Sequence, residues 1–164
     1  MSNLPLLIAS EVSVIAYALV AGVFLTFSDF VMGSLAAATP AGGIQSMQII
    51  NRKVFRTIFM VLLLGMSAAS PILAAFAVWQ GAGAATAWVV AAAMTYMIGV
   101  FLVTVVFNVP MNNRLDRMDH LSWAAEAYWL RYVPAWTFWN TVRWLASAVA
   151  AVCLLMAVVA LQAR

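Results

Sequence analysis

Hydrophobic residues gather in four long stretches of this chain, at residues 4–27, 57–78, 87–109 and 138–161. A bilayer core of about 30 Å needs roughly 20 apolar residues in a helix, so each stretch is long enough to cross it. Blocks such as AAFAV and VCLLMAVVAL do not alternate with polar residues, as the strands of a membrane barrel would. An isolated span must satisfy its backbone internally, and the pattern therefore predicts four transmembrane helices.

The polar connections between these stretches differ in length. The connection at 79–86 is short, whereas those at about 28–56 and 110–137 are long and carry six of the eight Lys and Arg residues, with Arg143 close by in the first turns of the fourth stretch. Four spans place both termini and the short loop on one side and both long loops on the other. The positive-inside tendency then predicts cytoplasmic long loops and both termini outside, in a multi-pass protein of a bacterial inner membrane.

The second long connection has an amphipathic pattern of its own. The residue before a proline avoids the helical region, so Val109-Pro110 is expected to break the third span. Residues 113–131 are then expected to form an amphipathic helix along the membrane interface, which stops before Pro134. The predicted fold is all-α: an integral membrane four-helix bundle with an interfacial helix between spans three and four, forming one transmembrane domain over residues 1–164.

The composition agrees with a membrane protein and excludes several chemistries. Hydrophobic residues make up 66% and charged residues 8%, against about a quarter charged in soluble domains. The net charge of +3 comes from scattered residues, which argues against nucleic-acid binding. Cys153 and His120 are the only residues of their kinds, so one chain offers no disulfide framework and no His/Cys metal centre. The lipid bilayer is the first partner that we expect, and we expect no metal.

Acidic residues and the single histidine suggest an acid–base site in the second long connection. On the predicted helix 113–131, Asp116, Asp119 and His120 lie at i, i+3 and i+4 and share one face. An imidazole beside carboxylates can act as a base near neutral pH. The alternative is an ordinary solvated face whose acids are balanced by neighbouring arginines.

The first span carries a stripe of small and acidic residues. Glu11, Ala18, Gly22 and Asp29 fall close to one line along the helix. The stripe is interpreted either as a packing face with acids near the two interfaces, or as a face that points Asp29 into a site beneath the long loops. A charge within a span is costly, which favours a functional role for Asp29, but its place near an interface weakens that inference.

A candidate binding face begins the fourth span. Trp136, Asn140 and Arg143 recur at i, i+4 and i+7, where an aromatic ring, an amide and a guanidinium can hold a flat aromatic or quinone-like molecule. Asn108 and Asn112 flank the expected helix break with amides that can bind freed backbone groups or a ligand. An interfacial belt of aromatic residues is the alternative interpretation.

Four segments resemble one known family: GVFLTFSDFVMGSL, MQIINRKVFR, FNVPMNNRL and WTFWNTVRW. They are similar to the anthrone-oxygenase-like family of small four-span integral membrane proteins. The resemblance implies a four-span bundle, and activity like that of characterised members, which oxidise anthrones to anthraquinones with molecular oxygen and without metal or flavin. The matching positions are Gln48, Asn51, Arg52, Asn108, Pro110, Asn112, Trp136, Trp139, Asn140 and Arg143.

The resulting hypothesis is a metal-free, membrane-embedded oxygenase for an anthrone- or hydroquinone-like substrate, with molecular oxygen as co-substrate and no cofactor. His120 or Asp116 would act as the base, and Arg52 or Arg143, with Asn108 and Asn112, would stabilise the enolate oxygen. The residues expected to bind the substrate are Gln48, Asn51, Arg52, Asn108, Trp136, Trp139 and Asn140. The alternative is a non-enzymatic subunit or assembly partner of a larger membrane complex, and a homo-oligomer is compatible with either.

Overall fold

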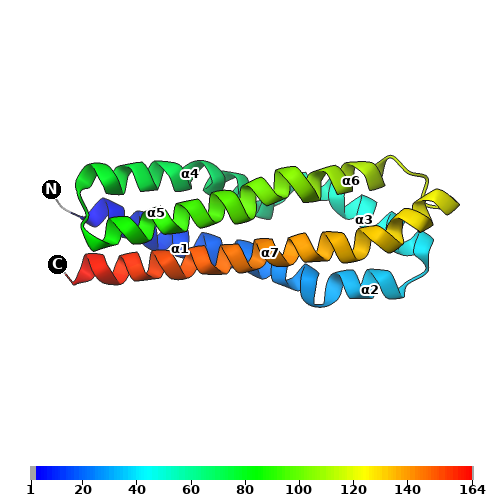
Figure 1. The fold of residues 1–164 in the computed structure, drawn as a ribbon, viewed down its shortest axis with the longest axis horizontal. Helices are drawn as coiled ribbons and strands as arrows, with labels where there is room; N and C mark the ends of the chain where they lie inside the picture. Colours follow the sequence, from blue (N-terminus) through cyan, green and yellow to red (C-terminus); the bar gives the residue numbers. More distant parts are fainter. Residues whose placement is uncertain (1–2, 164) are drawn as a thin grey trace.

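The chain is helical throughout in its computed structural model, which describes residues 3–163 (Figure 1). Four helical runs are long and apolar enough to cross a membrane, and they cover Leu4–Ala37, Ile58–Gln80, Ala84–Asp116 and Trp123–Gln162. The first and last of these begin and end at the same end of the bundle, beside the short turn between α4 (Ile58–Gln80) and α5 (Ala84–Tyr96). The prediction of an all-α bundle with four spans is confirmed.

Three of the runs continue well past the predicted spans. In the first, α1 (Leu4–Thr26) passes through a π-helical turn, η1 (Phe27–Val31), into α2 (Met32–Ala37). In the third, α5 passes through two π-helical turns, η3 (Met97–Leu102) and η4 (Thr104–Asn108), into α6 (Val109–Asp116). The last helix, α7 (Trp123–Gln162), has 40 residues. At 1.5 Å per residue it is about 60 Å long, roughly twice the thickness of a bilayer core. The bundle therefore projects from the membrane.

The projecting end is closed by a helix in the first long connection, which we expected to be a loop. Helix α3 (Pro40–Lys53) begins where the Thr39 hydroxyl accepts a hydrogen bond from the Gly42 amide, with proline at the first position. It packs against α6 and the start of α7 (Figure 1). A 3₁₀ turn, η2 (Val54–Arg56), then leads into α4. We call α2, α3, η2, α6 and the first turns of α7 the cap.

The prediction of an interfacial helix at 113–131 is wrong. Residues 113–116 end α6, residues 117–122 form a turn, and residues 123–131 are the first turns of α7. Val109 stays helical at φ −63° and ψ −46°, because the wide turn η4 directly before it accommodates a proline that lacks an N–H. Pro134 does not stop α7 because it lies on the exposed side of the helix, where the carbonyl it leaves free is open to solvent.

The bundle has two hydrophobic cores with a lipid-facing surface around the first. In the membrane half, the rings of Tyr17 and Tyr96 stack with centroids 4.5 Å apart, among small residues of all four runs. In the cap, Ile44 and Leu115 pack against aromatic residues of α7. The outer face of the membrane half is covered by exposed aliphatic side chains, as expected for contact with acyl chains. The protein is a multi-pass integral membrane protein.

The acidic stripe of the first span points outward, contrary to both interpretations of it. Glu11, Ala18, Gly22 and Asp29 are all exposed. The buried face of α1 instead carries Ser10, Ser13, Tyr17 and Phe24 among its residues. Within this chain the stripe is neither an internal packing face nor part of a site.

Close approach of α2 to α3 depends on Gly43. A Cβ atom at this position would overlap the carbonyl oxygen of Leu35 and press on the Trp129 ring, whereas nothing lies within 4 Å of a Cβ at Gly33 on the same hairpin. We expect Gly43→Ala to destabilise the protein by about 1–3 kcal/mol, measured by thermal unfolding in detergent. Gly33→Ala is the matched control and should be neutral or stabilising by up to about 1 kcal/mol. Equal effects of the two changes would contradict this account.

Candidate active site

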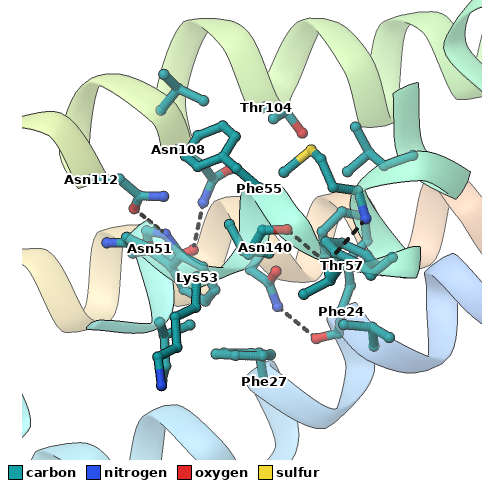
Figure 2. A pocket seen from close by; sticks show the side chains of 18 of the residues that line it. Phe24, Phe27, Asn51, Lys53, Phe55, Thr57, Thr104, Asn108, Asn112 and Asn140 are labelled. Carbon is teal, nitrogen blue, oxygen red and sulfur yellow. Dashed lines mark hydrogen bonds between the residues drawn. The ribbon is translucent and has the colours of Figure 1, made fainter. Parts of the chain in front are cut away.

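A cavity of about 680 Å³ lies between the two hydrophobic cores. Its walls come from the end of α1 with η1, from α3, η2 and the start of α4, from η3, η4 and α6, and from the middle of α7 (Figure 2). Small-molecule sites typically enclose about 300–1,000 Å³, so this volume suits a ligand of that size. Most of the lining is apolar, and its polar groups come both from the cap and from η4 and the middle of α7.

The cavity brings together polar residues from three separated segments of the sequence. Eight of the predicted site residues line it: Asn51, Arg52, Asn108, Asn112, Asp116, Trp136, Asn140 and Arg143. Figure 2 shows the side chains of Asn51, Asn108, Asn112 and Asn140 grouped at the cavity. The face formed by Trp136, Asn140 and Arg143 is buried, as a ligand-binding face requires and an exposed aromatic belt does not.

Three other predicted site residues lie outside the cavity lining. Gln48 is buried in the cap, where its Nε2 donates hydrogen bonds of 2.8 Å to the carbonyls of Leu115 and Met118 and so holds α3 to the end of α6. The Trp139 ring stacks on that of Phe107, with centroids 3.5 Å apart. These two side chains position helices around the site.

His120 is the third predicted site residue that lies outside the cavity lining, and the predicted acid–base face is not formed. Asp119 and His120 belong to the turn between α6 and α7, so they do not share a helical face with Asp116. Nδ1 of His120 lies 3.8 Å from Oδ1 of Asp119. The turn arises because α6 ends at Asp116 and the Ser122 hydroxyl caps α7 at the amide of Ala125.

Arg143 is buried in the cavity wall and is held by neutral groups. Its side chain is 5% exposed, and its guanidinium donates to Oδ1 of Asn140 at 2.7 Å and to Oγ1 of Thr104 at 3.3 Å. The guanidinium carbon lies 4.2 Å from the ring centroid of Phe24 and 5.3 Å from that of Trp136. Among residues 3–163 it forms no ion pair, and its Nε has no hydrogen-bond partner. A buried charge without a counter-ion is costly and is a functional candidate.

Asn140 joins α7 to α1 at the level of the cavity. Its Nδ2 donates to the carbonyl of Phe24 at 2.6 Å and to Oγ of Ser28 at 2.7 Å. The π-helical turn η1 begins three residues after Phe24 and disturbs the regular backbone bonding there, so that this carbonyl can accept a side-chain donor. Single π-helical turns often mark functional sites, and η1 and η4 both flank this cavity.

Asn112 fixes the aromatic wall of the cavity. Its Oδ1 accepts hydrogen bonds of 2.8 Å from both the Tyr132 hydroxyl and Nε1 of Trp136. Asn108 donates to the carbonyl of Trp136 at 3.4 Å, while its own buried Oδ1 has no partner among the described residues. Buried polar atoms are normally satisfied, so an unpaired one beside a cavity indicates a ligand or water.

The cap side of the cavity carries its only carboxylate among the described residues. Asp116 at the end of α6 forms an ion pair with Arg52 of α3, with Oδ1 and Nε 2.9 Å apart, and both side chains are partly exposed. Lys53 extends past Phe27, away from the asparagine side chains (Figure 2). The cavity thus has a wet, charged rim and a buried cationic end at Arg143.

Aromatic and hydroxyl groups of the first and third runs were missed in the sequence. Phe24, Phe27 and Thr104 line the cavity, and Ser28 orients Asn140. A signal for the first run was available, because polar side chains recur at helical spacing along its inward face, at Ser10, Ser13 and Tyr17 of α1 and at Ser28 of η1. No comparable signal identified Thr104.

The described residues do not supply a metal-ligand cluster. Within residues 3–163, no group of three or more His, Cys, Asp or Glu side chains could hold a metal ion. The chain offers amides, hydroxyls and guanidinium groups instead, which suit an organic ligand with oxygen atoms.

Comparison with known proteins identifies the family of the chain. No curated protein and no solved structure matches the chain. The sequence model of the anthrone oxygenase family matches residues 45–153, which is more than half of the chain and runs from α3 to the middle of the last span. This match includes the cavity residues from Asn51 to Arg143. The chain therefore belongs to the anthrone oxygenase family of membrane proteins.

Proposed function

We propose that this protein oxidises an anthrone- or hydroquinone-like aromatic substrate in the cavity, with molecular oxygen as co-substrate and without a metal or an organic cofactor. The observation that carries the proposal is Arg143, a buried guanidinium without a carboxylate partner within residues 3–163, placed between the rings of Phe24 and Trp136. Such a site stacks a flat ring and stabilises negative charge that develops on an oxygen of that ring.

The reaction balances with the substrate as the source of electrons. Loss of a proton from the CH₂ group of an anthrone gives an anion whose charge rests largely on the ketone oxygen. The anion passes one electron to oxygen, and the carbon radical and superoxide combine to form a carbon–oxygen bond. Protonation gives a hydroperoxide, which loses water as its O–O bond and the remaining C–H bond break. Anthrone and oxygen thus yield anthraquinone and water.

The cavity residues take separate roles in this scheme. Asp116 accepts the proton, because it is the carboxylate on the cavity rim, and Arg52 holds it in place. Arg143 donates to the enolate oxygen from a position fixed in advance by Asn140 and Thr104. Asn112 holds the Trp136 ring as a stacking surface.

The direct test is turnover by the purified protein. In detergent, with anthrone and dissolved oxygen, we expect anthraquinone absorbance to rise with consumption of one oxygen molecule per quinone, above the rate without protein. The rate should be unchanged by a metal chelator. A well-folded sample that turns over no anthrone or hydroquinone would favour the alternative, a non-enzymatic membrane subunit.

Removing the proposed base provides a second test. We expect Asp116→Asn to lower turnover about a hundredfold, at the low end of the usual effect of a general base because the substrate proton is already acidic. Asp119→Asn is the matched control, since Asp119 is exposed, lies in the next turn and does not line the cavity. Equal rates for the two variants would remove Asp116 from the mechanism.

The basic residues of the cap also support an orientation. Arg52, Lys53, Arg56, Arg114, Arg117 and Arg131 all belong to this end of the bundle. By the positive-inside tendency, the cap and the polar rim of the cavity face the cytoplasm. The substrate's oxygen atoms would then be bound at the cytoplasmic side of the membrane.

A further inference from the structure

The apolar side of the cavity reaches the outer surface of the bundle. Side chains that line the cavity are normally shielded, but five large apolar ones here are also exposed: Val23, Ile49, Phe55, Leu64 and Val105. A side chain that borders both the cavity and the outside stands at the rim of an opening. Leu64 and Val105 belong to membrane-spanning runs, so their outer sides contact acyl chains.

The opening follows from the unequal lengths of the second and third helical runs. These runs are antiparallel, and the Tyr96 hydroxyl donates to the carbonyl of Leu63, which fixes their register. Toward the cap, α4 extends only five residues from Leu63, to Ile58. The third run continues from Tyr96 to Asp116, and Val105 lies nine residues along it, about 14 Å of helical rise beyond Tyr96. Helix α4 packs on α1, α5 and η3 but has no comparable packing with η4 or α6. The flank of η4 is therefore left uncovered by α4.

This opening lies at the membrane boundary and is apolar on its inner side. Lys53 and Arg56 directly precede α4, and basic side chains at this position mark the level of the lipid headgroups. Besides the polar groups of η4 and α6, the lining from α4 and the third run includes these apolar side chains: Phe59, Met60, Leu63, Leu64, Phe101 and Val105. None of these side chains can hydrogen-bond a polar ligand, but all of them can contact a hydrocarbon chain.

We propose that the cavity is loaded sideways from the bilayer, through the opening between the η2–α4 segment and η4, and that its ligand is an amphiphile with a flat aromatic ketone or hydroquinone ring and an apolar chain. The ring lies at the Arg143 end, and the chain extends past Leu64 and Val105 into lipid. This inference names the substrate class of the proposed oxygenase and rests on that function, but it concerns binding and is testable without turnover.

The test uses a photoreactive diaryl ketone as a stand-in for the ring. Para-dodecylbenzophenone is dissolved in the lipid of nanodiscs that contain the full chain, under argon, and is irradiated so that its ketone carbon inserts into nearby C–H bonds. We expect mass spectrometry to find the label in the peptide that contains Met60, a residue of the cavity lining. Water-soluble benzophenone sulfonate at the same concentration should not compete.

Matched variants separate loading from lipid from loading from water. Val105→Trp narrows the opening and should lower labelling about tenfold, whereas Val106→Trp should not change it. Val105 and Val106 are 49% and 48% exposed, but only Val105 lines the cavity. If Val105→Trp does not fold, Leu64→Trp tests the opposite side of the opening, with the exposed, non-lining Val61→Trp as its control.

Two outcomes overturn the proposal: labelling that Val105→Trp and Leu64→Trp leave unchanged, and labelling by para-dodecylbenzophenone that benzophenone sulfonate at the same concentration suppresses. Its failure is distinguishable from failure of the proposed function. Anthrone turnover in detergent without labelling from lipid would overturn the lateral opening alone. Labelling that responds to Val105→Trp in a chain without turnover would support the opening and argue against the oxygenase.

Discussion

Replacing Arg143 with methionine is expected to lower anthrone turnover about a thousandfold, because it removes a fixed donor from a water-poor site where charge develops. The folded state should survive the change. Arg143 has no counter-ion among the described residues, and replacing a buried charge by an apolar side chain of similar length is often neutral or stabilising. The measurement is the rate of anthraquinone formation, with thermal unfolding recorded on the same sample.

Arg131→Met is the matched control for this variant. Arg131 lies on the same helix, three turns earlier, but is exposed and does not line the cavity. Arg143→Lys should give an intermediate rate, because an ammonium keeps the charge but cannot bond Asn140 and Thr104 in the planar geometry of a guanidinium. If Arg143→Met and Arg131→Met turned over anthrone equally fast, the oxyanion role of Arg143 would be excluded.

The membrane spans could be predicted because bilayer thickness sets the length of an apolar helix. The parts of the helices outside the membrane could not, because packing within the cap overrides local signals. Pro110 and Pro134 both indicate helix ends in the sequence, yet both lie inside helices. The π-helical turn η4 accommodates Pro110, and the backbone carbonyl that Pro134 leaves without a donor is open to solvent.

The predictions for the candidate site divide in the same way, into those that follow from local helical spacing and those that depend on tertiary packing. Trp136, Asn140 and Arg143 form one face because they recur at helical spacing within one helix, which a sequence displays directly. The positions of Gln48 and His120 relative to the cavity depend on how α3 docks on α6 and where α6 ends. These are tertiary facts without a periodic signal, so sequence patterns grouped both residues with the site.

Asn140 is the residue whose loss should destabilise the protein most. Asn140→Leu leaves the Phe24 carbonyl without its side-chain donor and deprives the buried Arg143 of its closest acceptor. Removing one partner of a buried charge is costly, and we expect a loss of about 3 kcal/mol, measured by thermal unfolding in nanodiscs. Thr137→Val is the control, because the buried Thr137 hydroxyl on the same helix has no hydrogen-bond partner in the described part of the chain, so its removal should leave the stability unchanged.

The double variant Asn140→Leu/Arg143→Met then identifies the cause of the destabilisation. If the destabilisation arises because the buried Arg143 guanidinium has lost its closest acceptor, removing the charge as well should restore most of the lost stability while turnover stays low. If the cost arises instead from the broken link between α7 and α1, the double variant should unfold as early as Asn140→Leu alone. Recovery of stability without recovery of activity would show that the site retains Arg143 for its chemistry at the expense of the fold.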